Sequence, residues 1–155
     1  MFRDVTTLFK DSIGFKKVIG ILYNRYKDKS IDIVVGIESR GFIIAGSLAE
    51  KLGCGFIPVR KKGKLPSEVE SQDYELEYGV DTVEIHKDAL HKGQRVLLID
   101  DLIATGGTAL ASCKLIERLG GIVVECGFIV DLPELKGRGR LSNYQVFTIV
   151  EFAGE

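Results

Sequence analysis

The stretch VLLIDDLIATGGT, from Val96 to Thr108, decides the fold and the kind of site that this sequence carries. Apolar residues precede two adjacent carboxylates, and a loop of small residues then leads into a segment with helical periodicity. This order predicts a buried strand, an acidic strand end, a glycine-rich loop and the start of a helix. In open α/β sheets, ligands bind outside the carboxyl ends of the strands, so we expect Asp100 and Asp101 to lie at a binding site.

The loop of small residues is suited to a phosphate group. Glycines allow close approach of the backbone, and the N–H groups and dipole at a helix start favour an anion. Asp100 and Asp101 would repel a phosphate, so we assign them to ribose hydroxyls or to a cation that bridges to them. The loop has neither the GK[ST] of a P-loop nor a GxGxxG dinucleotide fingerprint. The candidate phosphate-binding residues are Ala104, Thr105, Gly106, Gly107 and Thr108.

Helical and strand patterns alternate along the rest of the chain. Apolar positions from Phe15 to Tyr26 repeat with helical spacing, and IDIVVGI at 31–37 is typical of a strand buried on both faces. We expect further helices at 42–52 and 109–119, further strands at 54–59, 95–99, 122–130 and 144–152, a hairpin at 74–85, and a mobile loop at 60–73. The alternation predicts an α/β fold with a largely parallel central sheet.

Length and composition restrict the class of protein. The 155 residues fit one domain, which would bury roughly 70% of the surface of its unfolded chain. A net charge of -1 provides no positive field, so we expect neither a nucleic acid nor a membrane as partner. The N-terminus has no apolar signal segment, and Cys54, Cys113 and Cys126 are interpreted as buried, reduced thiols. These features predict a cytoplasmic enzyme.

Two further polar segments follow strands of the predicted sheet. The segment ESRG at 38–41 follows the first core strand, and without context a turn with a capping serine explains it as well as a ligand site does. The run RKKGK at 60–64 follows the next strand, and such runs are usually solvated surface charge. Because both segments lie at the same sheet, we take Arg40, Arg60 and Lys64 as candidates for binding an anionic phosphate group.

The segment from Val96 to Thr108 resembles the fingerprint of the type I phosphoribosyltransferases. In that family, an apolar strand, two acidic residues and a TGGT-like loop bind the ribose 5-phosphate of phosphoribosyl pyrophosphate (PRPP). The stretches FRDVTTLFKD (2–11), ESRGF (38–42), RKKGKLP (60–66) and YELEYG (74–79) resemble the members of the family that act on adenine. With the fingerprint, they span nearly the whole chain.

The resemblance implies a fold and a reaction. The fold is the type I phosphoribosyltransferase fold: one domain over residues 1–155, a mostly parallel sheet flanked by helices, a flexible active-site loop at 60–80, and a small hood formed by residues 1–8 and 131–155. The reaction transfers ribose 5-phosphate from PRPP to adenine and gives AMP and pyrophosphate, and the resemblance implies that Arg40, Arg60 and Lys64 contact the pyrophosphate. The implied cofactor is Mg²⁺, held by PRPP and water, with Asp100 and Asp101 as candidate protein ligands. The implied assembly is a homodimer.

The resemblance also assigns residues to the base. Phe2 stacks on the purine, Arg3 lies beside it, and the backbone of Met1 bonds the exocyclic amine. Glu77 lies near the base nitrogens on the closing loop and is the candidate general acid or base. The family has an N-terminal segment before the FRD stretch, whereas here Met1 directly precedes Phe2. We therefore expect the base pocket to be less complete than the donor pocket.

Two alternative functions fit the same sequence. The fingerprint binds the donor and does not choose the acceptor, so a transferase for hypoxanthine, xanthine or guanine is one alternative. A non-catalytic PRPP-sensing regulator, which keeps the donor loop and has lost turnover, is the other. A panel of purines offered with PRPP separates these functions from transfer to adenine.

Overall fold

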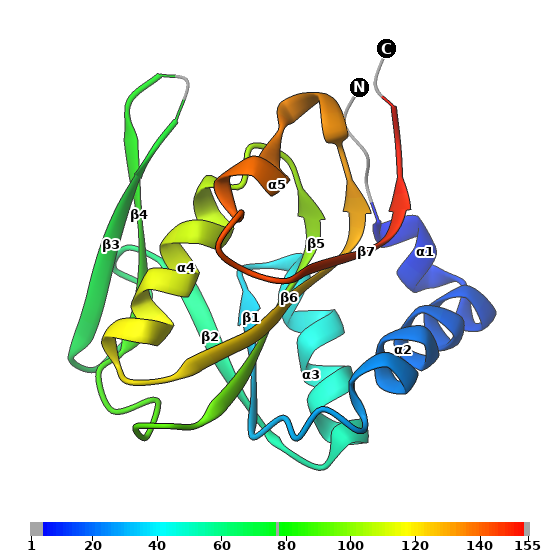
Figure 1. The fold of residues 1–155 in the computed structure, drawn as a ribbon, viewed down its shortest axis with the longest axis horizontal. Coiled ribbons are helices and arrows are strands. Elements are labelled where there is room, and N and C mark those ends of the chain that lie inside the picture. The colour runs from blue at the N-terminus through cyan, green and yellow to red at the C-terminus, as the bar shows by residue number, and fades with distance from the viewer. Residues whose placement is uncertain (1–4, 77, 154–155) are drawn as a thin grey trace.

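Five parallel strands form the body of a seven-stranded sheet in the computed structural model, which describes residues 5–76 and 78–153 (Figure 1). The order across the sheet is β3-β4-β2-β1-β5-β6-β7, and the two antiparallel strands β3 and β4 lie at one edge. The strands are β1 (Ile33–Ile37), β2 (Gly55–Lys61), β3 (Val69–Glu75), β4 (Val80–His86), β5 (Arg95–Ile103), β6 (Ile122–Asp131) and β7 (Val146–Glu151). The predicted α/β fold with a largely parallel sheet is confirmed.

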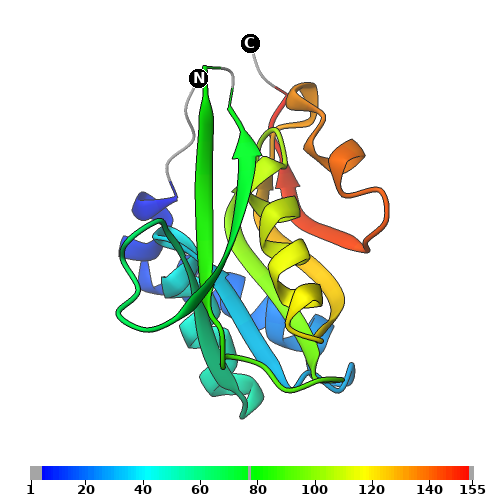
Figure 2. The same ribbon diagram turned by 90° about the vertical axis from the view of Figure 1, so that its left-hand side faces the viewer.

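Helices cover both faces of this sheet. Helices α2 and α3 pack on one face and α4 packs on the other, as Figures 1 and 2 show. The helices are α1 (Thr6–Lys10), α2 (Ser12–Tyr26), α3 (Arg40–Leu52), α4 (Gly107–Arg118) and α5 (Gly137–Arg140), with a 3-10 turn η1 at Pro133–Leu135. None of the helices in the described part of the chain is long and apolar enough to span a bilayer.

Alternation along the central strands explains why their sequence is almost continuously apolar. In β5, Leu97 and Ile99 pack with α2 and α3, whereas Val96 and Leu98 pack on the side of α4. Side chains of a strand point to opposite faces in turn, so a strand covered on both faces needs apolar residues at every position. The core thus consists of two layers that share β1 and β5.

The edge of the sheet differs from the prediction for residues 60–73. Strand β2 continues to Lys61 and β3 begins at Val69, so only residues 62–68 connect them. Strand β3 pairs with β4 along its whole length, from Val69 opposite His86 to Glu75 opposite Val80. The sequence of β3, VESQDYE, has few apolar residues because an edge strand is largely solvated, which is why a loop was expected there.

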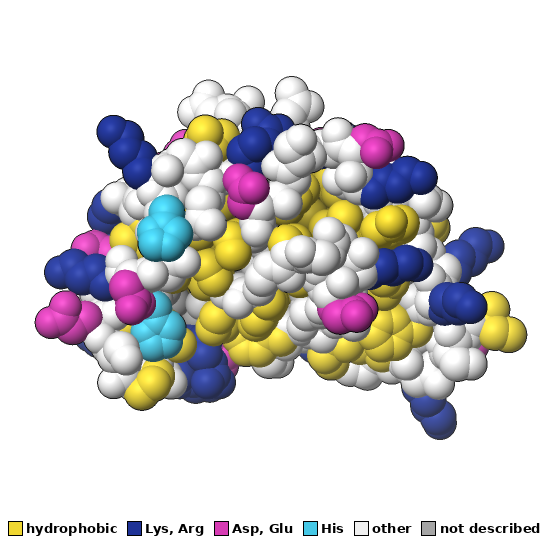
Figure 3. Space-filling model, turned by 90° about the horizontal axis from the view of Figure 1, so that it is seen from below, with side chains coloured by type: hydrophobic (Ala, Val, Ile, Leu, Met, Phe, Trp, Pro, Cys, Tyr) yellow, Lys and Arg dark blue, Asp and Glu magenta, His cyan; other side chains and the backbone are white. Residues whose placement is uncertain are grey.

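The carboxyl ends of the parallel strands point toward α5, and the β3–β4 hairpin extends toward the same end (Figures 1 and 2). The part of the predicted hood that the structure describes is divided: β7 pairs with β6 in the main sheet, while residues 133–140 form η1 and α5. The surface at the opposite end of the molecule carries the histidine side chains (Figure 3). His86 ends the antiparallel strand β4 and His91 precedes β5, so both lie away from the strand ends where the candidate site residues gather.

Candidate active site

The loop between β5 and α4 surrounds a small cavity of about 100 Å³. Helix α4 begins at Gly107, two residues earlier than predicted, so the loop proper is Ala104 to Gly106. The cavity is lined by residues 102–109, which include all five predicted phosphate-binding positions, and by Asp100. The first N–H groups of a helix have no acceptor within the helix, so this cavity combines backbone donors with the positive end of the helix dipole.

The backbone of Gly106 takes a conformation that requires glycine. Its φ is +83°, and a Cβ at this position would lie 2.7 Å from the carbonyl oxygen of Gly137. Gly137 begins α5, so the segment at 133–140 packs directly on the loop at 104–106, called the phosphate loop after the group that the sequence predicts for it. Gly137 is not among the predicted site residues.

The two aspartates lie inside β5 and not beyond its end, and they differ in their surroundings. The Asp101 carboxyl is buried and its Oδ2 lies 2.8 Å from Nε of Arg40, while Asp101 N–H donates to Oδ1 of Asp100 at 2.8 Å. Asp100 is half-buried and lines the small cavity as well as a larger one next to it. Burial, and then the negative charge of Asp101, raise the pKa of Asp100 well above its ordinary value. A cation or hydroxyl donors at Asp100 would offset this cost.

The larger cavity, of about 430 Å³, lies between the ends of β1, β2 and β5. The turn after β1 contributes Glu38, Ser39 and Arg40, with a cis peptide bond between Glu38 and Ser39. Arg40 is the first residue of α3, which begins two residues earlier than predicted. Ser39 occupies the N-cap position of α3, but its side chain makes no capping bond, so the interpretation as a capping serine is wrong. Ser39 lines the larger cavity instead.

The end of β2 and the basic loop after it are attached to this turn through Glu38. Arg60 Nε lies 3.3 Å and Lys64 Nζ 2.5 Å from the Glu38 carboxylate, and the N–H of Lys61 donates to it at 2.8 Å. Burial alone would raise the pKa of Glu38, but the bonds from Lys64 and from the Lys61 backbone outweigh it and lower that pKa. Arg60 and Lys64 are therefore held beside Glu38, which lines the cavity, and their contact with a phosphate group stays a prediction.

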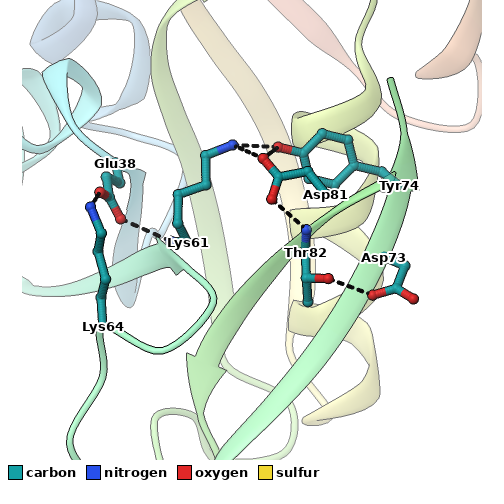
Figure 4. A network of polar contacts seen from close by, with 7 residues as sticks. All are labelled: Glu38, Lys61, Lys64, Asp73, Tyr74, Asp81 and Thr82. Atoms are coloured by element: carbon teal, nitrogen blue, oxygen red, sulfur yellow. Dashed lines mark hydrogen bonds and ion pairs between the residues drawn. The ribbon is translucent and has the colours of Figure 1, made fainter. Parts of the chain in front are cut away.

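Lys61 is a cation of the site that the sequence analysis missed. It lines the larger cavity, and its Nζ contacts the Tyr74 hydroxyl at 2.6 Å and Asp81 Oδ2 at 2.7 Å (Figure 4). Strand alternation was the available signal, because Lys61 follows the buried Val59 by two residues and so shares its face of β2.

The residues predicted to bind the base, Met1, Phe2 and Arg3, lie outside the described residues, and so does the predicted acid or base Glu77. Among the residues that are described, no group of three or more His, Cys, Asp or Glu side chains could hold a metal ion. The cysteines are free thiols: Cys113 and Cys126 are buried, as predicted, and Cys54 is half-buried.

Comparison with known proteins shows the family of this chain. The model of the phosphoribosyl transferase domain family matches residues 4–155. An adenine phosphoribosyltransferase of Nitrosospira multiformis is 58% identical over 99% of this chain and 89% of its own length. The crystal structure of adenine phosphoribosyltransferase from Thermoanaerobacter pseudethanolicus superposes with a TM-score of 0.95 at 48% identity, over 97% of this chain and 88% of that one.

A third relative carries bound ligands. The adenine phosphoribosyltransferase of Saccharomyces cerevisiae, crystallised with an imino-altritol bisphosphate and adenine, has a TM-score of 0.90 at 44% identity, and the match covers 96% of this chain and 86% of that one. The family model spans almost the whole chain. The relatives are identical to this chain at about half of its positions, and the solved ones have the same fold. The chain belongs to the phosphoribosyl transferase domain family and, within it, to the adenine phosphoribosyltransferases.

Proposed function

We propose that the protein transfers ribose 5-phosphate from PRPP to N9 of adenine and releases AMP and pyrophosphate. The observation that carries the proposal is the position of Asp100 between two cavities, one at the start of α4 and one among the cations Arg40 and Lys61. PRPP has a phosphate at one end, a pyrophosphate at the other, and two ribose hydroxyls between them. The arrangement of donors, carboxylate and cations matches that order.

The reaction requires the protein to stabilise a leaving anion, the pyrophosphate. The bond between C1 of the ribose and pyrophosphate breaks, positive charge builds on the ribose ring, and the bond to N9 forms as the N9 proton leaves. Interactions that strengthen in the transition state accelerate this step, so cations aimed at the departing pyrophosphate are the main contribution. We assign this role to Arg40, Arg60 and Lys64. Glu77 is the proposed acid or base for a purine nitrogen.

The residues of the site fit a magnesium ion that arrives with the substrate. Mg²⁺ prefers oxygen ligands and keeps several waters, so one or two carboxylates together with PRPP oxygens are enough. Asp100 has a carboxyl that gains from added positive charge, whereas Asp101 already contacts Arg40. When bound, the ion would neutralise pyrophosphate oxygens and orient the ribose hydroxyls; Asp100 would hold it, with Asp101 as the second candidate ligand.

The assignment of adenine as the acceptor rests on the relatives and on the predicted roles of the N-terminal residues. The yeast relative binds adenine, and the curated relatives carry the name of the adenine enzyme. We propose that Phe2 stacks on the base while Arg3 and the Met1 backbone contact its edge.

We further propose a homodimer in the cytoplasm. Ile43 on α3 and Phe56 on β2 are 45% and 37% exposed, and apolar side chains at a surface mark candidate contacts between proteins. Cys113 and Cys126 remain thiols although their sulfur atoms lie 3.5 Å apart, which fits a reducing compartment.

A panel of purines tests the proposal. Adenine, hypoxanthine, xanthine and guanine are each offered with PRPP and Mg²⁺, and pyrophosphate release is measured. We expect turnover with adenine alone. Turnover with another purine would assign the acceptor differently, and PRPP binding by calorimetry without release from any purine would favour a PRPP-sensing regulator.

A further inference from the structure

Lys61 connects the larger cavity to the β3–β4 hairpin. Its backbone is fixed on the sheet, because its N–H donates to Glu38 and it pairs with Val83 in β4. Its side chain reaches Tyr74 on β3 and Asp81 on β4, as Figure 4 shows. We call these contacts of Lys61 with Tyr74 and Asp81 the hairpin tie.

The hairpin tie lies at the boundary between an anchored and a projecting part of the hairpin. Nearer the sheet, Glu84 accepts bonds from Gly63 N–H at 2.8 Å and from the Ser71 hydroxyl at 2.7 Å, and Arg118 of α4 donates to the Ser71 carbonyl at 2.8 Å. The tied residues Tyr74 and Asp81 face each other in the β3–β4 ladder, and one further pair follows before the turn. The turn itself contains position 77, the proposed acid or base.

The cations around the cavity are already paired with carboxylates. Arg40 contacts Asp101, and Arg60 and Lys64 contact Glu38; all of these belong to the ends of the parallel strands or to the loops next to them. The hairpin tie differs, because its carboxylate belongs to the hairpin. An anion that enters the cavity and binds the Lys61 ammonium group in place of Asp81 would therefore also detach the projecting part of the hairpin from the sheet.

We propose that Lys61 is a positioning residue that exchanges Asp81 for the pyrophosphate group of the substrate and so couples occupation of the cavity to release of the hairpin. The inference rests on the proposed function, since it takes pyrophosphate as the anion in this cavity. In the observed arrangement, Lys61 holds the hairpin beside the sheet, with Tyr74 against Gly107 at the start of α4. Once pyrophosphate has bound the Lys61 ammonium group, the projecting part of the hairpin is free to move.

The energetics favour the exchange. The side chains of Lys61 and Asp81 are 40% and 35% exposed, and ion pairs this exposed to water are weak. Pyrophosphate carries more negative charge than one carboxylate, and its bonds to cations are charge-assisted on both sides. Because the Lys61 backbone stays bonded to Glu38, only its side chain has to turn.

Calorimetric binding of inorganic pyrophosphate, with Mg²⁺ present throughout, tests the exchange. Asp81→Asn removes the competing charge, so we expect pyrophosphate to bind roughly two- to fivefold more tightly than to the wild type, the scale of an exposed ion pair. Tyr74→Phe removes the hydroxyl that contacts both Lys61 and Asp81 but leaves the competing charge in place, so it should tighten binding less. Asp73→Asn is the matched control: it removes one negative charge from the same hairpin, where Asp73 accepts a bond from Thr82 and does not contact Lys61, so affinity should stay unchanged (Figure 4).

The double variant Lys61→Gln/Asp81→Asn completes a double-mutant cycle. Lys61→Gln should weaken binding, and in its background Asp81→Asn should bring no gain, because no ammonium group is left to release. An equal gain with and without Lys61, or the same gain from Asp73→Asn, would overturn the exchange and leave the proposed function intact. Failure of the wild type to bind pyrophosphate would instead contradict the proposed function itself.

Discussion

Replacing Gly106 by alanine tests how tightly the phosphate loop is held. An alanine at the observed φ of +83° would cost about 1–2 kcal/mol, because side chains disfavour the left-handed region. Its Cβ would also meet three backbone atoms of Gly137, at 2.7, 3.1 and 3.2 Å, and backbone cannot turn aside as a side chain does. Overpacking of this kind costs about 1–3 kcal/mol. We expect Gly106→Ala to lower the free energy of unfolding by about 2–5 kcal/mol in total.

Gly53→Ala provides the matched control. Gly53 ends α3 with a φ of +75°, and a Cβ there would meet no atom within 4 Å. This variant carries the conformational cost alone, so it should lose about 1–2 kcal/mol. The difference between the two variants isolates the contact of the phosphate loop with α5.

Urea unfolding and the KM for PRPP are the two measurements. To relieve the contact, the loop of Gly106→Ala has to shift by some tenths of an ångström, and we expect the KM for PRPP to rise on the order of tenfold. Gly53→Ala should leave the KM unchanged. Equal losses of stability in the two variants, with an unaltered KM in both, would refute the view that Gly137 fixes the phosphate-binding loop.

Two predictions concern carboxylates of the site. Glu77→Leu should lower kcat by on the order of 10²-fold while PRPP binding persists, because it removes a general acid or base; unchanged turnover in steady-state assays would exclude that role. Asp100→Asn should lower kcat/KM for PRPP by on the order of 10- to 100-fold, the scale of lost hydrogen bonds to a charged group. The same change should raise the Tm at neutral pH, since the folded protein holds the Asp100 pKa above its ordinary value and ionisation of this carboxyl therefore opposes folding. That gain in Tm should fade as the pH falls and Asp100 takes up its proton, and a gain that is constant with pH would contradict the assignment.

The central part of the fold was predictable because its strands are buried on both faces. The strand IVVGI at 33–37 and the apolar residues before Asp100 are covered on both faces of the sheet, so polar residues are not tolerated there and the apolar pattern indicates strands directly. Helix starts were predicted two residues late at Arg40 and Gly107, because polar residues and glycines at a first turn hide the helical pattern. The strand β3 escaped prediction because its side chains are largely solvated.

The candidate site was predicted unevenly for a related reason. Residues 104–108 line the small cavity, and a glycine-rich loop between a strand and a helix marks that position in the sequence. The pairing of Arg40 with Asp101, and of Lys61 with Asp81, depends on which strands become neighbours and on which face each side chain lies. Such contacts follow from the sheet order, which no local pattern contains.

The pairing of β1 with β5 has a consequence for how the protein acquires its site. These neighbouring strands join Ile33 to Val96, and the chain between them must form β2, β3, β4 and α3. Contacts between residues so distant in sequence are slow to form, because the entropy of closing a long loop is lost before the contact stabilises the chain. The phosphate loop is local and can form early, whereas the larger cavity exists only after this central pairing. A ligand that bridges both cavities binds only the folded chain, so PRPP should act as a folding ligand that slows unfolding and shields the nascent enzyme from proteolysis.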